Sequence, residues 1–532
     1  MFTYLKRNSS YFAGALFCIL ISSIFAVALQ FFKGDVLDYA VAGEVHAAAS
    51  HAMLLFASLI LECLFYFFYK RMSAGFIVRC TRQLKHDIFN SIIQRTYVAY
   101  KTLSQGAYTA KITNEADAIK TRKFSMLPLL WEILFKILFV SVALFFLDWR
   151  IALITIVLLT TPLYIPKLIE KRLQRVQSEY VKTIEEYLSK IIDWLSGFEI
   201  IKNFSIEHHI MKRFQQVNDA SMEKLLHDYQ LSVFAQLITT LISYFSYFII
   251  LAGSAWLVLI GDFSAGDFFI AIGMVDQLSY PLISLAEIIR QLVAITPICT
   301  DMHRFIKAPD EIPVRSILQG IYKEIRFRDV TFSYDGQLPL LKNFNLTIEK
   351  GKRYLLRGPS GCGKTTTINL LLRYYDVDSG CIEIDGVPIE HFNNSYDIIT
   401  VVRQEAVLFH DTLRNNLTMF RDTSDIQLIE LLGQLGLEKF ANAKALDSII
   451  SENGANLSGG EKKRICLARA LIRNTDVLVI DEPLANLDSD TVNKIEDLLL
   501  SIMGKTMLVV SHQFSEEKLR VFDEVVDYSL VK

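Results

Sequence analysis

Long apolar runs alternate with charged stretches over the N-terminal half of the chain. A helix needs about 20 apolar residues to cross a bilayer, and six runs have the apolar character of membrane spans. They cover residues 11–32, 51–69, 126–147, 151–164, 235–260 and 268–285. Only residues 148–150 separate the third run from the fourth, and only residues 261–267 separate the fifth from the sixth. Each pair is therefore predicted to form a tight hairpin, with both turns on the same side of the membrane.

The charges between the runs predict the orientation of the spans. Lys6 and Arg7 precede the first run, and residues 70–123 are strongly basic. The positive-inside rule places both segments in the cytoplasm. The stretch 33–50 carries three carboxylates and is expected on the outer face. Six crossings then return the C-terminus to the cytoplasm.

A secretory signal peptide is the alternative interpretation of the N-terminus. Lys6 and Arg7 precede an apolar run that contains the small-residue sequence Ala26-Val27-Ala28. The run is longer than the apolar core of about 7–15 residues that signal peptides carry. Cleavage would also leave five spans and place the C-terminal part of the chain outside the cell. We therefore interpret the run as the first membrane span.

Charged, helically periodic segments follow the second and fourth runs, at residues 70–123 and 167–232. They are too long for turns and too polar for lipid, so they are predicted to continue the spans as helices into the cytoplasm. Pro309 and Pro313 then break the helical pattern, and beyond about Tyr322 strands alternate with helices, as in an α/β domain. The predicted organisation is a six-helix transmembrane domain with cytoplasmic extensions at 1–307, a linker at 308–322 and an α/β domain at 323–532.

The composition agrees with a membrane protein and excludes other classes. The hydrophobic fraction of 52% exceeds ordinary soluble usage. The formal net charge of -2 gives no reason to expect nucleic acid as a partner, since that would call for a concentrated basic face. The seven cysteines lack the paired spacing and the accompanying histidines of a zinc or redox site. They are interpreted as small buried apolar side chains.

A glycine-rich segment follows the apolar, strand-like residues 354–356. It fits the pattern G-x-x-x-x-G-K-[ST], whose backbone N–H groups wrap phosphate oxygens. Lys364 would neutralise the β- and γ-phosphates and Thr365 would hold magnesium, and the helix expected after the loop places the phosphates at a helix N-terminus. The candidate nucleotide-binding residues are Gly358, Pro359, Ser360, Gly361, Cys362, Gly363, Lys364, Thr365 and Thr366.

A second apolar strand, residues 477–480, ends in Asp481 and Glu482. An acidic residue at this position can hold magnesium through water. A short aliphatic strand followed by two acids is also common in purely structural roles. Its position after the phosphate loop, in the same α/β domain, favours the functional interpretation.

Between these motifs lies the sequence Leu457-Ser458-Gly459-Gly460-Glu461, followed by a helical run. This tract resembles the signature sequence of ATP-binding cassette (ABC) proteins. Taken alone, the remaining matches would be ordinary strand or loop residues, but they occur in the order that the family shows. They are Tyr334 for the aromatic residue that stacks on adenine, Gln404 for the glutamine loop, Glu452 and Gly454 for the exporter loop before the signature, Asn486-Leu487-Asp488 for the D-loop, and His512 for the switch histidine.

The resemblance implies an exporter-type half-transporter, in which a six-helix membrane domain is fused to an α/β P-loop NTPase domain with a helical subdomain. It implies ATP and Mg²⁺ as cofactors, with Glu482 as general base and Gln404 and His512 as further catalytic residues. The implied metal-holding residues are Thr365, Gln404 and Asp481. The residues implied to contact the ATP of a second cassette are Ser458, Gly459 and Gly460. The implied partners are an identical or homologous half-transporter, the lipid bilayer and an unidentified cargo, in the cytoplasmic membrane of a bacterial cell.

Three further features carry expectations. Residues 106–117 and 197–207 are similar to the coupling regions of ABC exporters, and the apolar tip 198–204 is predicted to dock near Gln404 of a cassette because exposed apolar turns need cover. The family usually has glutamine where this chain has Glu461. A carboxylate close to ATP would weaken nucleotide binding by repulsion, unless it points away from the nucleotide.

The direction of transport and the cargo stay open at this stage. The leading hypothesis is an exporter of peptides, drugs or lipids. The alternatives are an importer of a metal-chelating or haem-like ligand and an ATP-gated membrane regulator that moves no cargo. Glu132 and Lys136, four residues apart in one span, are expected to neutralise each other. Glu62 and Asp276 have no such neighbour, which suggests an acidic cavity for cationic or peptide-like cargo.

Overall fold

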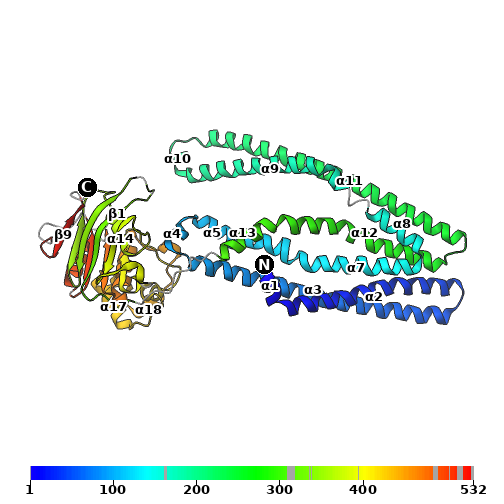
Figure 1. Cartoon of the computed structure of the whole chain (residues 1–532), viewed down its shortest axis with the longest axis horizontal. Coiled ribbons are helices and arrows are strands. Elements are labelled where there is room, and N and C mark those ends of the chain that lie inside the picture. The colour runs from blue at the N-terminus through cyan, green and yellow to red at the C-terminus, as the bar shows by residue number, and fades with distance from the viewer. Residues whose placement is uncertain are drawn as a thin grey trace. The chain divides into compact units, whose positions relative to one another are not determined.

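The structure, a computed structural model, describes residues 2–160, 165–307, 318–334, 336, 338–392, 395–482, 489–502, 504–511 and 519–528. The chain forms two compact units. The helical unit comprises Met1–Gln94 and Ser104–Ala308, and the sheet unit comprises Arg95–Leu103 and Pro309–Lys532. Figure 1 shows long helices in the first unit and the strands gathered in the second.

The helical unit consists of long helices linked by short turns and helical segments (Figure 1). They are α1 (Phe2–Arg7), α2 (Ser9–Val41), α3 (Val45–Ile93), α5 (Gln105–Ala110), α6 (Ala116–Ile119), α7 (Met126–Leu147), α8 (Trp149–Thr160), α9 (Ile165–Ser196), α10 (Phe198–Asn203), α11 (Glu207–Leu259), α12 (Ala265–Ala294) and α13 (Thr296–Lys307), with the π-helical turns η1 (Lys111–Glu115) and η2 (Lys120–Phe124). The charged extensions after the second span and before the fifth are helical, as predicted.

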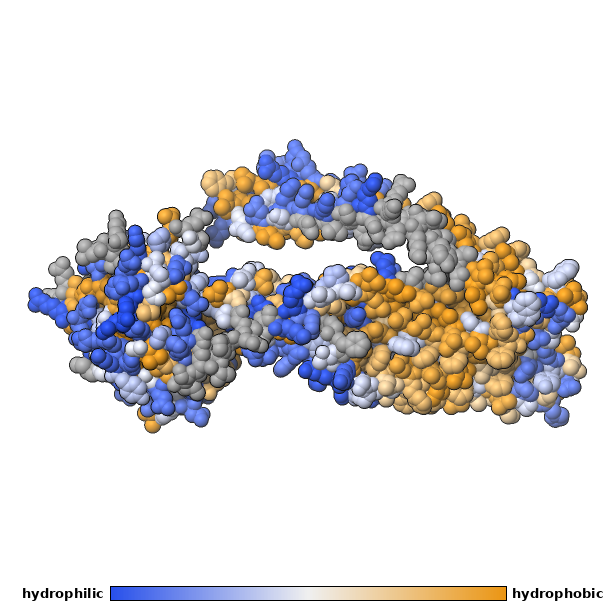
Figure 2. All heavy atoms as spheres, viewed as in Figure 1, coloured by the Kyte–Doolittle hydropathy of each residue, from blue (hydrophilic) through white to orange (hydrophobic). Residues whose placement is uncertain are grey.

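Four helical stretches among the described residues are long and apolar enough to cross a membrane, namely Ser9–Val41, Val45–Ile93, Gln105–Leu147 and Glu207–Leu259. The predicted fourth span begins in α8, which is apolar over Trp149–Leu158, and its last residues, 161–164, lie outside the described chain. The sixth falls in α12. Apolar side chains dominate the outer surface of these helices in the view of Figure 2.

The two predicted hairpin turns lie together. Only Asp148 separates α7 from α8, and the turn between α11 and α12 contains Asp262. Arg150 Nη2 lies 2.9 Å from an Asp148 carboxylate oxygen and 3.0 Å from an Asp262 carboxylate oxygen. One guanidinium therefore joins both turns, which confirms that they share one end of the helical unit.

Helices α2 and α12 pack closely near the same end. The Asp38 carboxylate accepts hydrogen bonds from Ser264 Oγ at 2.6 Å and from the Gly266 backbone N–H at 2.7 Å. A Cβ at Gly34 would lie 2.5 Å from Ile270 Cδ1, so these helices approach as they do only because glycine occupies the contact. Small residues at helix contacts allow this approach in membrane proteins.

The expected pairing of Glu132 with Lys136 is present, with a distance of 3.1 Å. Lys70, on α3, lies at the same distance from the other carboxylate oxygen, and Glu132 is 5% exposed. The buried carboxylate of Glu132 thus forms ion pairs with two ammonium groups. The second partner could not be found from helical spacing, because it comes from another helix.

The sheet unit holds a five-stranded parallel sheet of order β6-β7-β8-β3-β9 and a four-stranded antiparallel sheet of order β2-β1-β4-β5. The strands are β1 (Glu324–Phe332), β2 (Leu341–Glu349), β3 (Arg353–Arg357), β4 (Ser379–Ile384), β5 (Val387–Pro388), β6 (Ile399–Val402), β7 (Val477–Asp481), β8 (Thr506–Val510) and β9 (Glu524–Asp527). The helices are α4 (Tyr97–Lys101), α14 (Lys364–Leu371), α15 (Ser395–Ile398), α16 (Leu413–Thr418), α17 (Asp425–Gln434), α18 (Ala443–Leu446), α19 (Gly459–Arg473) and α20 (Ser489–Ser501), with the 3₁₀ turns η4 (Ile389–His391), η5 (Glu438–Phe440) and η6 (Glu452–Gly454).

The parallel strands are short aliphatic runs because both of their faces are covered. In β7, Val477 and Val479 pack into one hydrophobic cluster while Leu478 and Ile480 pack into another. Strand β8 lies between β3 and β7, and parallel strands end at the same edge of a sheet. The residues that follow β3 and the last residue of β7 are therefore brought to one edge, where ligands bind in open α/β sheets.

Candidate nucleotide site

The phosphate loop, residues 358–363, joins the carboxyl end of β3 to α14. Gly358, Gly361 and Gly363 have φ values of 149°, 80° and 108°, which glycine adopts at little cost. At Gly363, a Cβ would also lie 2.7 Å from Leu341 Cδ2. These glycines let the loop turn directly into α14, whose first N–H groups carry a partial positive charge.

Lys364, the first residue of α14, turns its side chain back over the loop. Its ammonium donates to the carbonyl oxygens of Gly358 at 2.6 Å and Pro359 at 2.9 Å, and the residue is 7% exposed. The cation is thus held inside the curve of the loop.

Asp481 ends β7 beside the phosphate loop and is 6% exposed. Burial raises the pKa of its carboxyl group, and the adjacent Glu482 raises that pKa further. The Arg403 guanidinium, the Lys364 ammonium and the Thr365 hydroxyl group act in the opposite direction. The structure therefore brings together Thr365 and Asp481, two of the three predicted metal-holding residues, with the predicted phosphate-binding lysine.

Glu482 occupies a strained backbone position at the turn after β7. Its φ is 51°, and a left-handed residue with a side chain costs roughly 1–3 kcal/mol. Its backbone N–H donates to Val510 O at 2.9 Å, which ties the turn to β8. Gln404 Nε2 donates to Glu482 Oε2 at 2.7 Å. Two residues predicted to be catalytic from separate motifs are therefore in direct contact.

Tyr334, the residue predicted to stack on adenine, is half-exposed, with 54% of its surface accessible. Edge-to-face contacts with Phe332 and Tyr375 hold the ring, at centroid distances of 4.9 and 5.2 Å. Its hydroxyl group is 3.0 Å from Thr366 Oγ1. This contact gives Thr366, a predicted nucleotide-binding residue, a role in orienting the tyrosine.

Glu461 is held at the start of α19 by a reciprocal cap. Its carboxylate accepts a hydrogen bond from the Ser458 backbone N–H at 2.9 Å, and Ser458 Oγ accepts one from the Glu461 N–H at 3.3 Å. Lys439 Nζ lies 2.5 Å from the second carboxylate oxygen. Burial alone would raise the pKa of Glu461, but Lys439 and the Ser458 N–H hold it below its usual value. The charge that replaces the usual glutamine is thus paired within the chain.

The remaining predicted site residues divide into two groups. Glu452 and Gly454 lie in η6, where Gly454 is buried with a φ of 66°. His512 and residues 486–488 lie outside the described residues, so their assignments stay predictions.

One further aromatic residue of the sheet unit contacts the side chains around Tyr334, although the sequence did not indicate it. Tyr97, in α4, stacks on Tyr374 with centroids 3.8 Å apart and planes 9° apart, and it makes an edge contact with Tyr375 at 6.1 Å. Tyr375 in turn contacts Tyr334. A chain of rings therefore connects a segment from between the second and third spans to the candidate adenine-stacking residue. No motif marks this tyrosine in the sequence.

A phosphate loop and an acidic strand end at one sheet edge, in a chain with apolar bilayer-length helices, define a membrane-bound P-loop ATPase. Residues 12–282 match the ABC transporter transmembrane region, and residues 341–485 match the ABC transporter family of ATP-binding domains. The chain belongs to the ABC transporter family. It is an ATP-dependent translocase of the exporter type.

Curated relatives match over most of the chain. The chain is 25% identical to an ATP-dependent lipid A-core flippase of Syntrophus aciditrophicus over 98% of its own length and 88% of that protein. It is also 25% identical to the ATP-dependent lipid A-core flippase of Escherichia coli, over 83% of this chain and 77% of that protein. The solved structure of a bacterial Atm1-family ABC exporter with ATP bound has the same fold, with a TM-score of 0.80 and 23% identity over 98% of this chain and 94% of that one.

We predict that Lys364→Ala and Glu482→Gln abolish ATP turnover in different ways. Loss of the ammonium should raise the half-saturating ATP concentration by at least about tenfold, whereas loss of the general base should lower kcat by about 100-fold or more. Glu482→Gln should bind ATP as well as the wild type. Steady-state ATPase kinetics and nucleotide-binding titrations separate the two effects, with Glu390→Gln as an exposed control. Wild-type turnover in Glu482→Gln would exclude it as the base.

A second prediction concerns the paired charge at the signature. Lys439→Ala should raise the half-saturating ATP concentration by a few-fold, since a partly exposed ion pair contributes about 0.2–1 kcal/mol and its loss leaves Glu461 uncompensated. Glu461→Gln should behave like the wild type because glutamine also forms the cap. The double variant should recover wild-type ATP dependence. If the double variant were as impaired as Lys439→Ala, the charge of Glu461 would not be the cause.

Proposed function

We propose that this chain is one half of a dimeric exporter that hydrolyses ATP, with Mg²⁺, to move an amphipathic, lipid-like cargo out of a bacterial cytoplasmic membrane. The observation that carries the proposal is the Gln404–Glu482 hydrogen bond beside the phosphate loop. In the proposed mechanism this hydrogen bond would orient the Glu482 carboxylate to take a proton from the water that attacks the terminal phosphate of ATP. Neither import of a chelated ligand nor regulation without transport has an observation of its own in its favour.

Two chains are required because one cassette holds only half of each site. Within the described residues, no hydrogen bond or ion pair joins Ser458, Gly459 or Gly460 to the phosphate loop, and the side chain of Ser458 is engaged in the cap of its own helix. The family resemblance implies that the signature of one chain closes over the ATP held by the other. An identical or a homologous chain could supply it.

The residues at the sheet edge suit a magnesium ion. Thr365, Asp481 and Gln404 offer a hydroxyl, a carboxylate and an amide oxygen, the hard donors that Mg²⁺ prefers. Bound there with ATP, the ion would neutralise charge on the phosphate oxygens. Lys364 would bind the same oxygens, Gln404 would orient Glu482, and Glu482 would accept the proton of the attacking water. Opening and closing of the cassettes would then drive the membrane helices.

The proposed cargo class rests on the relatives and on the membrane helices. Two proteins that match this chain over most of their length are named lipid A-core flippases. The helical unit exposes large apolar side chains along its spans, such as Phe56, Phe146 and Trp256. Such a surface places the transporter among lipids, which can reach it from within the bilayer.

Lipid movement by the reconstituted protein tests this function. We expect fluorescent phospholipids in proteoliposomes to change leaflet in an ATP-dependent manner, measured by chemical quenching of the outer leaflet. Glu482→Gln in matched vesicles is the control and should show no movement above that of empty vesicles. ATP hydrolysis without movement of any lipid in a panel of head groups would contradict the lipid cargo while leaving the ATPase assignment intact.

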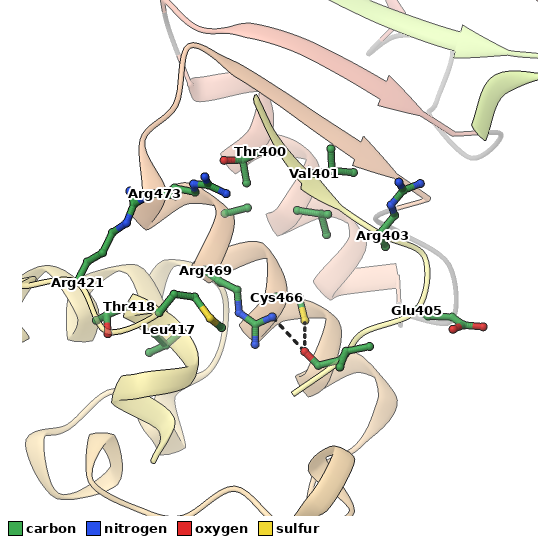
Figure 3. A pocket seen from close by; sticks show the side chains of 14 residues that line it. Thr400, Val401, Arg403, Glu405, Leu417, Thr418, Arg421, Cys466, Arg469 and Arg473 are labelled. Carbon is green, nitrogen blue, oxygen red and sulfur yellow. Dashed lines mark hydrogen bonds between the residues drawn. The ribbon is translucent and has the colours of Figure 1, made fainter. Parts of the chain in front are cut away.

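A cleft in the sheet unit offers a docking place for the apolar tip that the sequence singled out. The cleft has a volume of about 490 Å³ and lies between β6, α16 and α19. Figure 3 shows the arginines around it, with Arg421 and Arg473 on one side. The charged residues that line it are Arg403, Arg421, Arg469, Arg473 and Glu405. Four cations and one carboxylate leave the cleft with a net positive charge.

Helix α10 offers apolar side chains and a charge that suit this cleft. It carries the exposed side chains of Phe198 and Ile200, 57% and 60% accessible. Lys202 is already paired with Glu207 at 3.0 Å, which leaves Glu199 as the charge that α10 can offer. The exposed apolar side chains of α10 can pack on the apolar side chains of the cleft, and its unpaired carboxylate can bind the arginines there. We therefore propose that α10 of one chain docks in this cleft of its partner.

Crosslinking tests the docking. In a variant without the seven native cysteines, Ile200→Cys and Val407→Cys should form a disulfide between two chains, seen as a band of doubled mass. Val525→Cys, on β9 at the opposite edge of the parallel sheet from β6, is the matched control and should not crosslink to Ile200→Cys. Failure of the cleft pair in an active protein, or equal crosslinking of the control, would contradict the contact.

A further inference from the structure

A cavity in the helical unit brings two opposite charges to one wall. Its volume is about 420 Å³, and it lies along α2 and α12. The residues that line it are Gln30, Lys33, Phe269, Ile272, Gly273, Asp276 and Gln277. The acidic cavity expected from Glu62 and Asp276 is therefore not what the structure shows, because Lys33 lines the same cavity as Asp276 and Glu62 does not line it.

The wall that carries these residues is fixed. Asp38 ties the ends of α2 and α12 together through Ser264 and Gly266. Further along the same contact, Gln277 Nε2 donates to the Ala26 carbonyl oxygen at 3.0 Å. Gly273 lies so close to the Gln30 side chain that an added Cβ would overlap it. Lys33 and Asp276 are thus presented by two helices that cannot easily separate.

Neither charge has an ion-pair partner within 4.0 Å among the described residues. This differs from Glu132, which binds two lysines, and from Arg150, which binds two aspartates. Asp276 is exposed and Lys33 is half-buried. A charge that faces hydrocarbon costs at least about 2.5 kcal/mol, so these groups must face water or a polar ligand.

Their position along the helices places Lys33 toward the outer face of the membrane and Asp276 near its middle. Lys33 precedes the end of α2 at Val41, and Asp276 follows the start of α12 at Ala265. With a rise of 1.5 Å per residue, they lie about 12 and 17 Å from these outer ends. The hydrocarbon core is about 30 Å thick, so its centre lies about 15 Å from either face. Lys33 therefore lies in the outer half and Asp276 close to the centre.

We propose that this cavity binds the zwitterionic head group of a lipid cargo during translocation, an inference that rests on the proposed export of lipids. The Lys33 ammonium would bind the phosphate and the Asp276 carboxylate would bind the head-group ammonium. Gln30 offers an amide for further hydrogen bonds. Phe269, 53% exposed, and Ile272 would contact the glycerol and the first part of an acyl chain.

A lipid suits the cavity better than a peptide does. The lining offers one positive charge, one negative charge and apolar side chains, and the described lining includes only two amide side chains. A peptide backbone carries many polar groups, each of which costs free energy when it is buried without a partner. A phosphoethanolamine head group has one phosphate and one ammonium and leaves its chains in the bilayer.

Stimulation of ATPase activity by short-chain lipids tests the assignment on the whole protein in a non-ionic detergent. Dioctanoyl phosphatidylethanolamine should stimulate the wild type. Lys33→Met and Asp276→Asn should each raise its half-stimulating concentration by about tenfold or more. Dioctanoyl phosphatidylglycerol, which lacks the ammonium, should respond to Lys33→Met but not to Asp276→Asn. Glu62→Gln removes another carboxylate of the spans that does not line the cavity, and it should match the wild type.

Several results would overturn the inference. Unchanged stimulation in both cavity variants would do so, as would stimulation by zwitterionic tripeptides and not by the lipid. The double variant Lys33→Asp with Asp276→Lys exchanges the two charges. If it had wild-type stability and wild-type stimulation by the lipid, the two residues would form a structural ion pair in another conformation of the protein. If the wild-type protein showed no ATPase activity that depends on Glu482, the proposed function itself would be refuted. The two failures are therefore distinguishable.

Discussion

Two adjacent carboxylates, Asp481 and Glu482, end a strand whose residues are buried on both faces. Burial raises the pKa of Asp481, and the adjacent charge of Glu482 raises that pKa further. The positive charges of Arg403 and Lys364 lower the pKa of Asp481, and Gln404 donates a hydrogen bond to the carboxylate of Glu482. The phosphate loop, the glutamine loop and the order of the strands all have to be correct for these groups to meet. The nucleotide chemistry depends on this balance of charge at one sheet edge.

The helical unit contains charges of two kinds, those with ion-pair partners and those without. Where stability is needed, charges are fully paired, as in the cluster of Glu132 with two lysines and in the turn held by Arg150. Where α2 and α12 form the cavity wall, the closest helix contacts are made by glycine and by Asp38, and the charges beside them are left without ion-pair partners among the described residues. The same two helices therefore provide both a rigid contact and a polar surface for cargo.

Much of this arrangement could be predicted from the sequence, because the phosphate loop, the signature and the apolar runs are local patterns. The hairpin turns and the Glu132–Lys136 pair follow from short spacing and were found in the structure. Contacts between distant segments could not be predicted in the same way. Lys70 and Lys439 pair with Glu132 and Glu461, and Lys33 lines the same cavity as Asp276, only because of how distant segments pack together. The departure at Glu461 was visible in the sequence, but its neutralisation was not.

The stack of Tyr97 on Tyr374 separates the boundary of the ATPase domain in space from its boundary in sequence. A fragment that starts at the linker would leave Tyr97 behind and expose the ring face that it covers. Such a fragment would expose an aromatic surface close to the candidate adenine-stacking residue. We expect its nucleotide affinity to differ from that of the intact protein. Exchange of ATPase domains between related transporters meets the same condition. A chimera would have to carry residues 95–103 from the same parent as its cassette.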